Sequence, residues 1–194
     1  MTGSSLFRGT HIRLTALTLD DLPTMACWYE DPEFQRLYDS RPAYPQTEAD
    51  LAKWLEKLGE DKNTFAFAVR ALDGDDLLGY LEVDGVDWQH GVCGMGLAFG
   101  KQANRGKGYG YEATKLALRY AFDELNLHRV QVTVFSYNHR SLALVYKVGF
   151  RREGVFRERL RRDGDRHDML LYGMLRHEWE ALGLGNGPRA SRVA

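Results

Sequence analysis

The chain has 194 residues, of which 44% are hydrophobic and 27% are charged, with a formal net charge of −1. This length and balance indicate one globular domain and exclude disordered, fibrous and broadly basic nucleic-acid-binding proteins. No run approaches the roughly 20 apolar residues of a membrane span, and residues 1–8 lack the apolar core of a secretion signal.

In the N-terminal half, hydrophobic periodicity predicts alternating strands and helices. In chain order they are a strand at 11–17, a helix from 19 that stops or kinks at Asp31-Pro32, a helix from 48 to about 59, and strands at 65–69, 77–83 and 92–99. Thr18 and Thr47 each precede acidic residues, so they are the expected helix N-caps.

The C-terminal half contains the most regular patterns of the chain. The predicted elements are a helix at 109–125, a valine-rich strand at 129–135, a helix at 138–148 closed by Gly149, and strands at 150–157 and 167–175 that turn at Asp163-Gly164. Together these elements predict an α/β (α+β) fold with one mixed, mostly antiparallel sheet and helices on both faces.

No linker or repeat divides the chain. We therefore expect a single domain over residues 11–182, with flexible ends at 1–10 and 183–194. The only cysteines, Cys27 and Cys93, lie far apart. This usage is typical of a cytoplasmic protein and excludes a disulfide framework, and the six histidines form no cluster with the spacing of metal ligands.

The stretch Lys101 to Gly110, KQANRGKGYG, carries the clearest chemical signal. It holds three basic residues and no acidic one, and it leads into the most regular helix without a Ser, Thr, Asp or Asn cap. The first N–H groups of such a helix need a partner, and an anion suits them because glycine lets a phosphate approach the backbone. The alternative is a solvated basic loop.

Two known phosphate loops fail by spacing. The interval from Gly100 to Gly106 is one residue too long for a P-loop, and Gly108 replaces the required hydroxyl residue. The glycines at 106, 108 and 110 also lack the spacing of the dinucleotide fingerprint.

The segment Arg105-Gly106-Lys107-Gly108-Tyr109-Gly110 instead resembles the acyl-coenzyme A loop of the GNAT superfamily of N-acetyltransferases. Asn138-x-x-Ser141, Tyr146-Lys147-x-Gly149-Phe150 and Glu153-Gly154 extend the resemblance to the RimJ/RimL and spermidine acetyltransferase branch. The resemblance implies about seven strands, splayed between the fourth and the fifth. Acetyl-CoA would enter the splay, with the backbone of Leu97, Ala98 and Phe99 pairing with pantetheine and the amides of 105–110 holding the pyrophosphate. Gly94, Gly96 and Gly100 independently suggest a bulge or the close approach of a ligand.

The resemblance also assigns roles to individual residues. Asn138 would bond the pantetheine arm, or serve only as a helix N-cap, and Ser141 would lie beside it. Tyr146 would protonate the leaving thiolate, or be a core tyrosine. For the general base, Glu82 is the better candidate because it interrupts an apolar run, with Asp84 or a water chain as alternatives. The competing interpretation is that Glu82 lies on the solvated face of an edge strand.

The expected activity is direct acetyl transfer from acetyl-CoA to a primary amine, without a metal and without an acyl-enzyme. Neither cysteine lies in a motif that would depress its pKa. The alternatives are a non-catalytic acyl-CoA sensor and an RNA- or ribosome-associated module that uses the seven arginines between 151 and 166. No membrane partner is expected, nucleic acid is disfavoured by the near-neutral charge, and a homodimer is expected.

The charge distribution suggests a class of acceptor. Residues 1–97 hold 8 basic and 17 acidic residues, whereas residues 98–194 hold 18 basic and 10 acidic. In the fold implied by the resemblance, the acceptor approaches over the N-terminal helices. We therefore expect a cationic acceptor, such as a polyamine, drawn by the acids of that region: Asp20, Asp21, Glu30, Asp31, Glu33, Asp39, Glu48 and Asp50.

Overall fold

Seven strands form one sheet in the order β1-β2-β3-β4-β5-β7-β6 in the computed structural model, which describes residues 6–101, 104 and 106–184. The strands are β1 Ile12–Thr15, β2 Phe65–Ala71, β3 Leu77–Asp87, β4 Val92–Phe99, β5 Arg129–Phe135, β6 Arg151–Arg162 and β7 Asp165–Leu175. The helices are α1 Leu22–Tyr29, α2 Pro32–Tyr38, α3 Glu48–Glu60, α4 Tyr109–Arg119, α5 His139–Val148 and α6 Arg176–Ala181.

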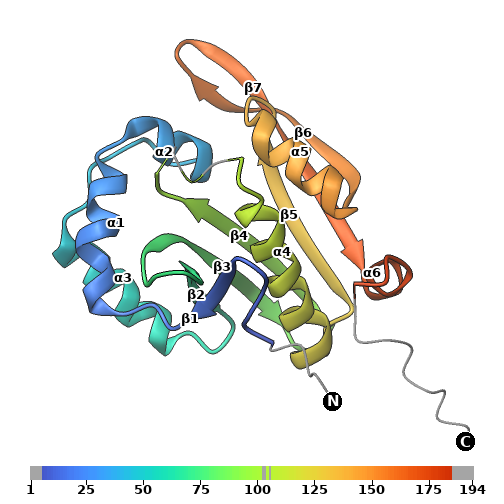
Figure 1. The fold of residues 1–194 in the computed structure, drawn as a ribbon. Helices are drawn as coiled ribbons and strands as arrows, with labels where there is room; N and C mark the ends of the chain where they lie inside the picture. The colour runs from blue at the N-terminus through green and yellow to red at the C-terminus, as the bar shows by residue number, and fades with distance from the viewer. Residues whose placement is uncertain (1–5, 102–103, 105, 185–194) are drawn as a thin grey trace, which may run out of the picture.

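The sheet opens between its fourth and fifth strands. Every neighbouring pair is antiparallel except β4 and β5, which run parallel and pair only through Val92–Arg129, Cys93–Val130 and Gly94–Gln131. Beyond Gly94 the two strands diverge toward the top of the view in Figure 1. The predicted fold class, a mixed sheet splayed at this place, is confirmed.

Helices cover both faces because successive side chains of a strand point to opposite faces. Val69, Leu81 and Val83 pack in one core with α4 residues such as Leu116 and Ala117. Ala68, Tyr80 and Ala98 face the other way, into a second core with side chains of α1, α2 and α3. Figure 1 shows α4 in front of the sheet and α1 to α3 beside it. Tyr80 and Glu82 share a face by this alternation, so Glu82 belongs to the α1–α3 side.

The first helix stops before Asp31-Pro32 as predicted, but a second helix, which was not predicted, begins at Pro32. The side chain of Asp31 accepts a hydrogen bond from the Glu33 amide at 2.8 Å, and Pro32 is the first residue of α2. Proline suits this position because its missing N–H has no partner in a helix's first turn in any case. The sequence analysis therefore missed α2, the helix whose last residue, Tyr38, lines the cavity.

Several boundaries also differ from the predictions. The long helix ends at Arg119 and continues as a π-helical segment, Tyr120–Glu124, and α6 was not predicted. Within the N-terminal segment expected to be flexible, residues 6–10 contact the domain: the Phe7 ring lies 5.7 Å from that of Phe67. The carbonyl of Phe7 accepts a hydrogen bond from the Leu14 amide at 2.8 Å. Residues 1–5 and 185–194 of the two expected flexible ends lie outside the described residues.

Candidate active site

A cavity of about 790 Å³ occupies the opening between β4 and β5. It is lined by β3, β4, β5 and α5, by the N-terminal end of α4, and by α2. The structure thus brings together most of the residues that the sequence singled out: Glu82, Asp84, Leu97, Ala98, Phe99, Gly106, Gly108, Tyr109, Gly110, Asn138 and Ser141. Lys107 and Tyr146 are not among the lining residues, and Arg105 lies outside the described residues.

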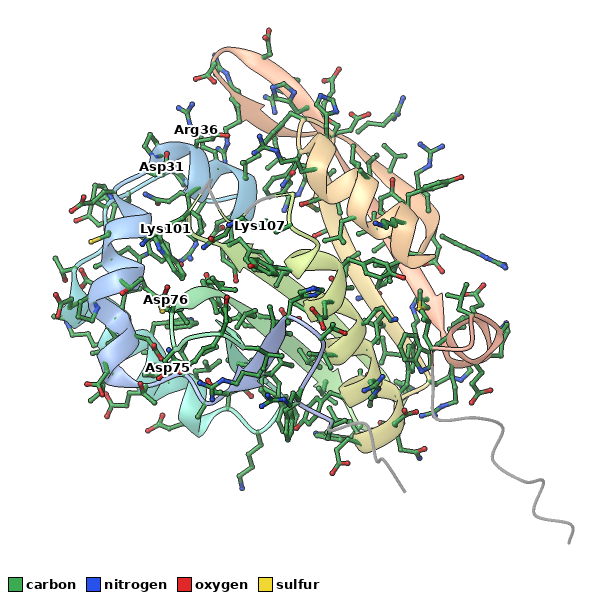
Figure 2. The ribbon with its side chains drawn as sticks, in the orientation of Figure 1. Asp31, Arg36, Asp75, Asp76, Lys101 and Lys107 are labelled. Carbon is green, nitrogen blue, oxygen red and sulfur yellow. The ribbon has the colours of Figure 1, made fainter. Side chains whose placement is uncertain are left out.

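The first turn of α4 has no side-chain cap. Gly108 occupies the N-cap position with φ of +84°, and its neighbour Gly106 has φ of +78°. A Cβ atom on either glycine would meet nothing within 4 Å, so space remains open beside the backbone there. Lys101 and Lys107, labelled in Figure 2, lie on the loop between β4 and α4. Open backbone, free helical N–H groups and basic side chains make this end of the cavity suited to a phosphate group.

The edge of β4 that faces β5 carries no strand ladder from Met95 to Phe99, because pairing with β5 ends at Gly94. On its other edge β4 pairs with β3 as far as Phe99. An extended chain with amide groups can therefore lie along Leu97, Ala98 and Phe99 as an additional strand would. This geometry suits the pantetheine arm of a coenzyme A thioester.

The register of β3 and β4 shifts between Asp84 and Asp87, beside Gly94, as the expected bulge requires, and Gly96 lines the cavity. Gly94 and Gly100 also make room for protein side chains. A Cβ on Gly94 would collide with the carboxylate of Asp84, and one on Gly100 with the ring of Trp28. At Gly96 the nearest atoms are the Tyr38 hydroxyl at 3.6 Å and Glu82 Oε2 at 3.7 Å. The absence of a side chain at Gly94 therefore lets the Asp84 carboxylate fold over the neighbouring strand, whereas a Cβ at Gly96 would make only ordinary contacts.

Glu82 is the carboxylate best placed for proton transfer. It lies on β3, the third strand of the sheet, so the alternative of a solvated edge strand is wrong. Its Oε2 accepts a hydrogen bond from the Tyr38 hydroxyl at 2.9 Å. Burial raises the pKa of Glu82, an effect that the Tyr38 hydrogen bond opposes and the charges of Asp84 and Asp39 reinforce. A carboxylate with a raised pKa accepts protons more readily near neutral pH.

Three tyrosines lie on the Glu82 side of the cavity: Tyr38 bonds to Glu82, and Tyr29 and Tyr80 pack behind it. The sequence analysis identified none of them as a site residue. The hydroxyls of Tyr29 and Tyr80 lie 3.0 Å apart, and the rings of Tyr38 and Tyr80 are 5.4 Å apart, edge to face. Burial, followed by the charge of Glu82, raises the pKa of Tyr38 well above its ordinary value, so this hydroxyl keeps its proton and donates a hydrogen bond to Glu82. The Asp31-Pro32 helix start was the one signal that could have located Tyr38.

Asn138 serves as the N-cap of α5 and also ties α2 in place. Its Oδ1 accepts a hydrogen bond from the Ser141 amide at 3.1 Å, and its Nδ2 donates to the Leu37 carbonyl at 3.1 Å. Asn138 is buried and lines the cavity together with Ser141. The capping role is therefore present, and the contact with pantetheine stays a prediction.

Tyr146 points away from the cavity. Its side chain is 82% exposed, whereas Val145, one residue earlier on α5, is buried and lines the cavity. Neither of the two predicted placements, in the core or beside the leaving thiolate, matches this position. The role of Tyr146 as a general acid gains no support from the geometry.

The two cysteines offer no acyl-enzyme in this arrangement. Cys93 is buried in β4, and this burial, with the nearby charge of Asp84, raises the pKa of its thiol to about 12. Cys27 is on α1 and does not line the cavity. A thiol that remains protonated at neutral pH is a poor nucleophile.

Four of the eight acids expected to attract a cation have structural partners that stabilise the fold. Asp21 forms a buried ion pair with Arg70 at 2.7 Å, and Asp31 caps α2. Asp50 accepts hydrogen bonds from Thr47 at the start of α3, and Asp39 pairs with Arg41. Of the eight acids named from the sequence, Asp39 alone lines the cavity between β4 and β5.

The arginine-rich β6–β7 hairpin reaches across the open end of the sheet to α2. Arg36 of α2 pairs with Asp163 at the hairpin turn at 3.1 Å. Nη2 of Arg162 donates to the carbonyls of Asp39 and Ser40, both at 3.0 Å, and of Arg41 at 3.1 Å. The hairpin therefore fixes the loop that follows α2, a role that its composition alone did not indicate.

No cluster of three or more His, Cys, Asp or Glu that could hold a metal ion occurs within residues 6–101, 104 and 106–184. Over the same residues, no helix has both the length and the apolar character needed to cross a membrane.

Comparisons with known proteins agree with this geometry. The family model described as an acetyltransferase (GNAT) domain matches residues 11–151. The prophage-derived uncharacterized N-acetyltransferase YokL of Bacillus subtilis is 31% identical, over 89% of this chain and 94% of its own. The ribosomal protein uS5 alanine N-acetyltransferase of Escherichia coli is 25% identical, over 73% of each chain.

Among solved structures, the spermidine N-acetyltransferase of Vibrio cholerae in complex with CoA and spermine superposes with a TM-score of 0.79 at 23% identity, covering 87% of this chain and 97% of that one. At this identity the likeness shows a shared fold. With the family match, the related N-acetyltransferases and a cavity suited to a coenzyme A thioester, the chain belongs to the GNAT family and is an acetyl-CoA-dependent N-acetyltransferase.

Proposed function

We propose that the protein transfers the acetyl group directly to a primary amine in a ternary complex, with Glu82 as the general base. The observation that carries this proposal is the position of Glu82: a half-buried carboxylate with a raised pKa, on the wall of the cavity where β4 and β5 separate. Acetyl-CoA would lie along Leu97, Ala98 and Phe99, with its pyrophosphate at residues 105–110. Asn138 and Ser141 would flank the pantetheine arm.

Proton transfer begins the reaction. Glu82 takes one proton from the acceptor's ammonium group, and the free amine then attacks the thioester carbon to form a C–N bond. As the C–S bond breaks, the nitrogen loses its second proton and the thiolate gains one, so that CoA leaves as a thiol. Glu82 then releases its proton to solvent, which restores the carboxylate.

The variant Glu82→Gln tests this role. Loss of a general base predicts a fall in kcat of about 10²–10⁴, with the CoA dissociation constant changed little. Asp84→Asn is the matched control, because Asp84 lines the same cavity and burial also raises its pKa. A thiol-release assay at saturating acetyl-CoA measures both. An equal loss in Asp84→Asn, or normal turnover in Glu82→Gln, would contradict the assignment.

The stability of Glu82→Gln separates catalysis from a structural role. Because burial raises the folded-state pKa of Glu82, the stability linked to its proton is present below the unfolded-state pKa and lost as pH rises through the folded-state value. At pH 7 the wild type therefore holds a desolvated charge. We expect the variant to be at least as stable as the wild type at pH 7, with this advantage absent below about pH 4, as measured by urea unfolding.

The similar proteins differ in the acceptor that their names give: one is a spermidine N-acetyltransferase, and another acetylates the alanine of a ribosomal protein. A cationic acceptor, whether a polyamine, another amino compound or a protein N-terminus, stays the prediction of the sequence's charge distribution. The structural partners of Asp21, Asp31, Asp39 and Asp50 weaken its basis. A cytoplasmic location and a homodimer likewise stay predictions, and sedimentation velocity tests the second.

A further inference from the structure

A second cavity, of about 530 Å³, lies on the α1–α3 side of the sheet. It shares Tyr38, Asp39 and Glu82 with the cavity between β4 and β5, so the two meet at the proposed base. The second cavity lacks the β4 edge and the α4 start that suit acetyl-CoA. A molecule entering through it would reach Glu82 without displacing the acyl donor.

The inner part of this cavity is aromatic. Tyr80, 1% exposed, and Trp54 line it with their rings 5.7 Å apart, edge to face, and Tyr29 and Tyr38 complete the wall. Such a surface accepts the methylene groups of an acceptor while its amine lies at Glu82.

The α3 side of the cavity, where Lys53 and Lys57 outnumber Asp50, carries a net positive charge. Lys53 and Lys57 stand one turn apart on α3, both exposed, and neither forms an ion pair within 4 Å among the described residues. Of the other charged residues there, Arg41 is paired with Asp39, and the Asp50 carboxylate, which accepts hydrogen bonds from Thr47 and interacts with the charge of Lys53, offsets one of the two lysine charges. The cavity is therefore negative at Glu82 and positive at its α3 side.

This polarity matches an amine that carries an anion at its far end. We propose, resting on the assignment of Glu82 as base, that the acceptor is an amino carboxylate with several carbons between its two ends, whose carboxylate meets Lys53 and Lys57 while its amine meets Glu82. A polyamine would instead place its distal ammonium against two lysines, a like-charge contact that disfavours it.

Three acceptors with the same five-carbon chain test the proposal: 5-aminopentanoate, pentylamine and 1,5-diaminopentane differ only in the distal group. We expect kcat/KM, measured by thiol release at saturating acetyl-CoA, to be highest for 5-aminopentanoate and lowest for the diamine. The double variant Lys53→Gln/Lys57→Gln should reduce kcat/KM for 5-aminopentanoate by more than about twofold and up to roughly thirtyfold, the range of two solvent-screened ion pairs. It should leave pentylamine within about twofold, since an uncharged end has no screened ion pair to lose.

Lys62→Gln is the matched control, because Lys62 is exposed and lines neither cavity. Calorimetric binding of the three compounds to the CoA-saturated protein runs in parallel, so that a slowly acetylated compound still reports its affinity. A preference for the diamine, equal affinity for all three compounds, no measurable binding of 5-aminopentanoate, or an unchanged preference in the double variant overturns the acceptor class. Retained turnover in Glu82→Gln overturns the proposed base instead, so the two failures are distinguishable.

Discussion

Gly108 at the start of α4 offers a sharp test of the coenzyme A site. Its φ of +84° lies in the left-handed region, where a residue with a Cβ costs about 1–2 kcal/mol. Nothing lies within 4 Å of the added Cβ, so Gly108→Ala introduces this strain and no clash. We expect the free energy of unfolding to fall by the same roughly 1–2 kcal/mol.

The effect on binding is separate from this strain. The Cβ would occupy the open space through which a phosphate oxygen reaches the N–H groups of the first turn. Loss of one charge-assisted hydrogen bond, at about 1.5–3 kcal/mol, predicts a rise in the CoA dissociation constant of roughly tenfold to a hundredfold. Isothermal titration with CoA measures the affinity, and urea unfolding measures the stability.

Gly164 in the β6–β7 turn is the matched control. Its φ is +94°, a Cβ there also meets nothing within 4 Å, and it lines neither cavity. Gly164→Ala should therefore lose similar stability and keep its affinity for CoA. The reasoning is refuted if Gly108→Ala binds CoA as the wild type does, or if Gly164→Ala loses as much affinity.

Two further predictions concern side chains around the site. Tyr146→Phe should keep kcat within about twofold, since the side chain is 82% exposed and outside the cavity; in a thiol-release assay, a fall of about 10²–10⁴ would restore its role as general acid. Arg162→Ala should raise the acceptor's KM roughly fivefold or more and leave CoA affinity unchanged, because the loop carrying Asp39 and Arg41 loses three hydrogen bonds. Steady-state kinetics measures this effect against Arg159→Ala, an exposed arginine of the same strand, and equal effects in the two variants would count against the positioning role.

Local patterns determined much of this protein. Alternation and helical spacing predict β4 and β5 with their observed bounds, and Gly149 ends α5 with a φ of +106° as expected of a helix-closing glycine. The start of α4 without a side-chain cap was also predictable from the sequence, because it depends only on which residue types precede the helix. These features follow from interactions between residues near in sequence, so the sequence contains them directly.

The tertiary structure alone decided what surrounds the reacting atoms. Whether Glu82 is solvated or buried depends on Tyr38, 44 residues away, and on its strand lying inside the sheet. The orientation of Tyr146 depends on which face of α5 packs inward. Val145, one residue earlier, is buried on that face, whereas Tyr146 is exposed. The sequence also does not show that Asp84 and Trp28, from other elements, fill the space beside Gly94 and Gly100. A site in this fold is assembled from helices, strands and loops far apart in the chain, so its contacts arise only when the sheet and its two layers of helices come together.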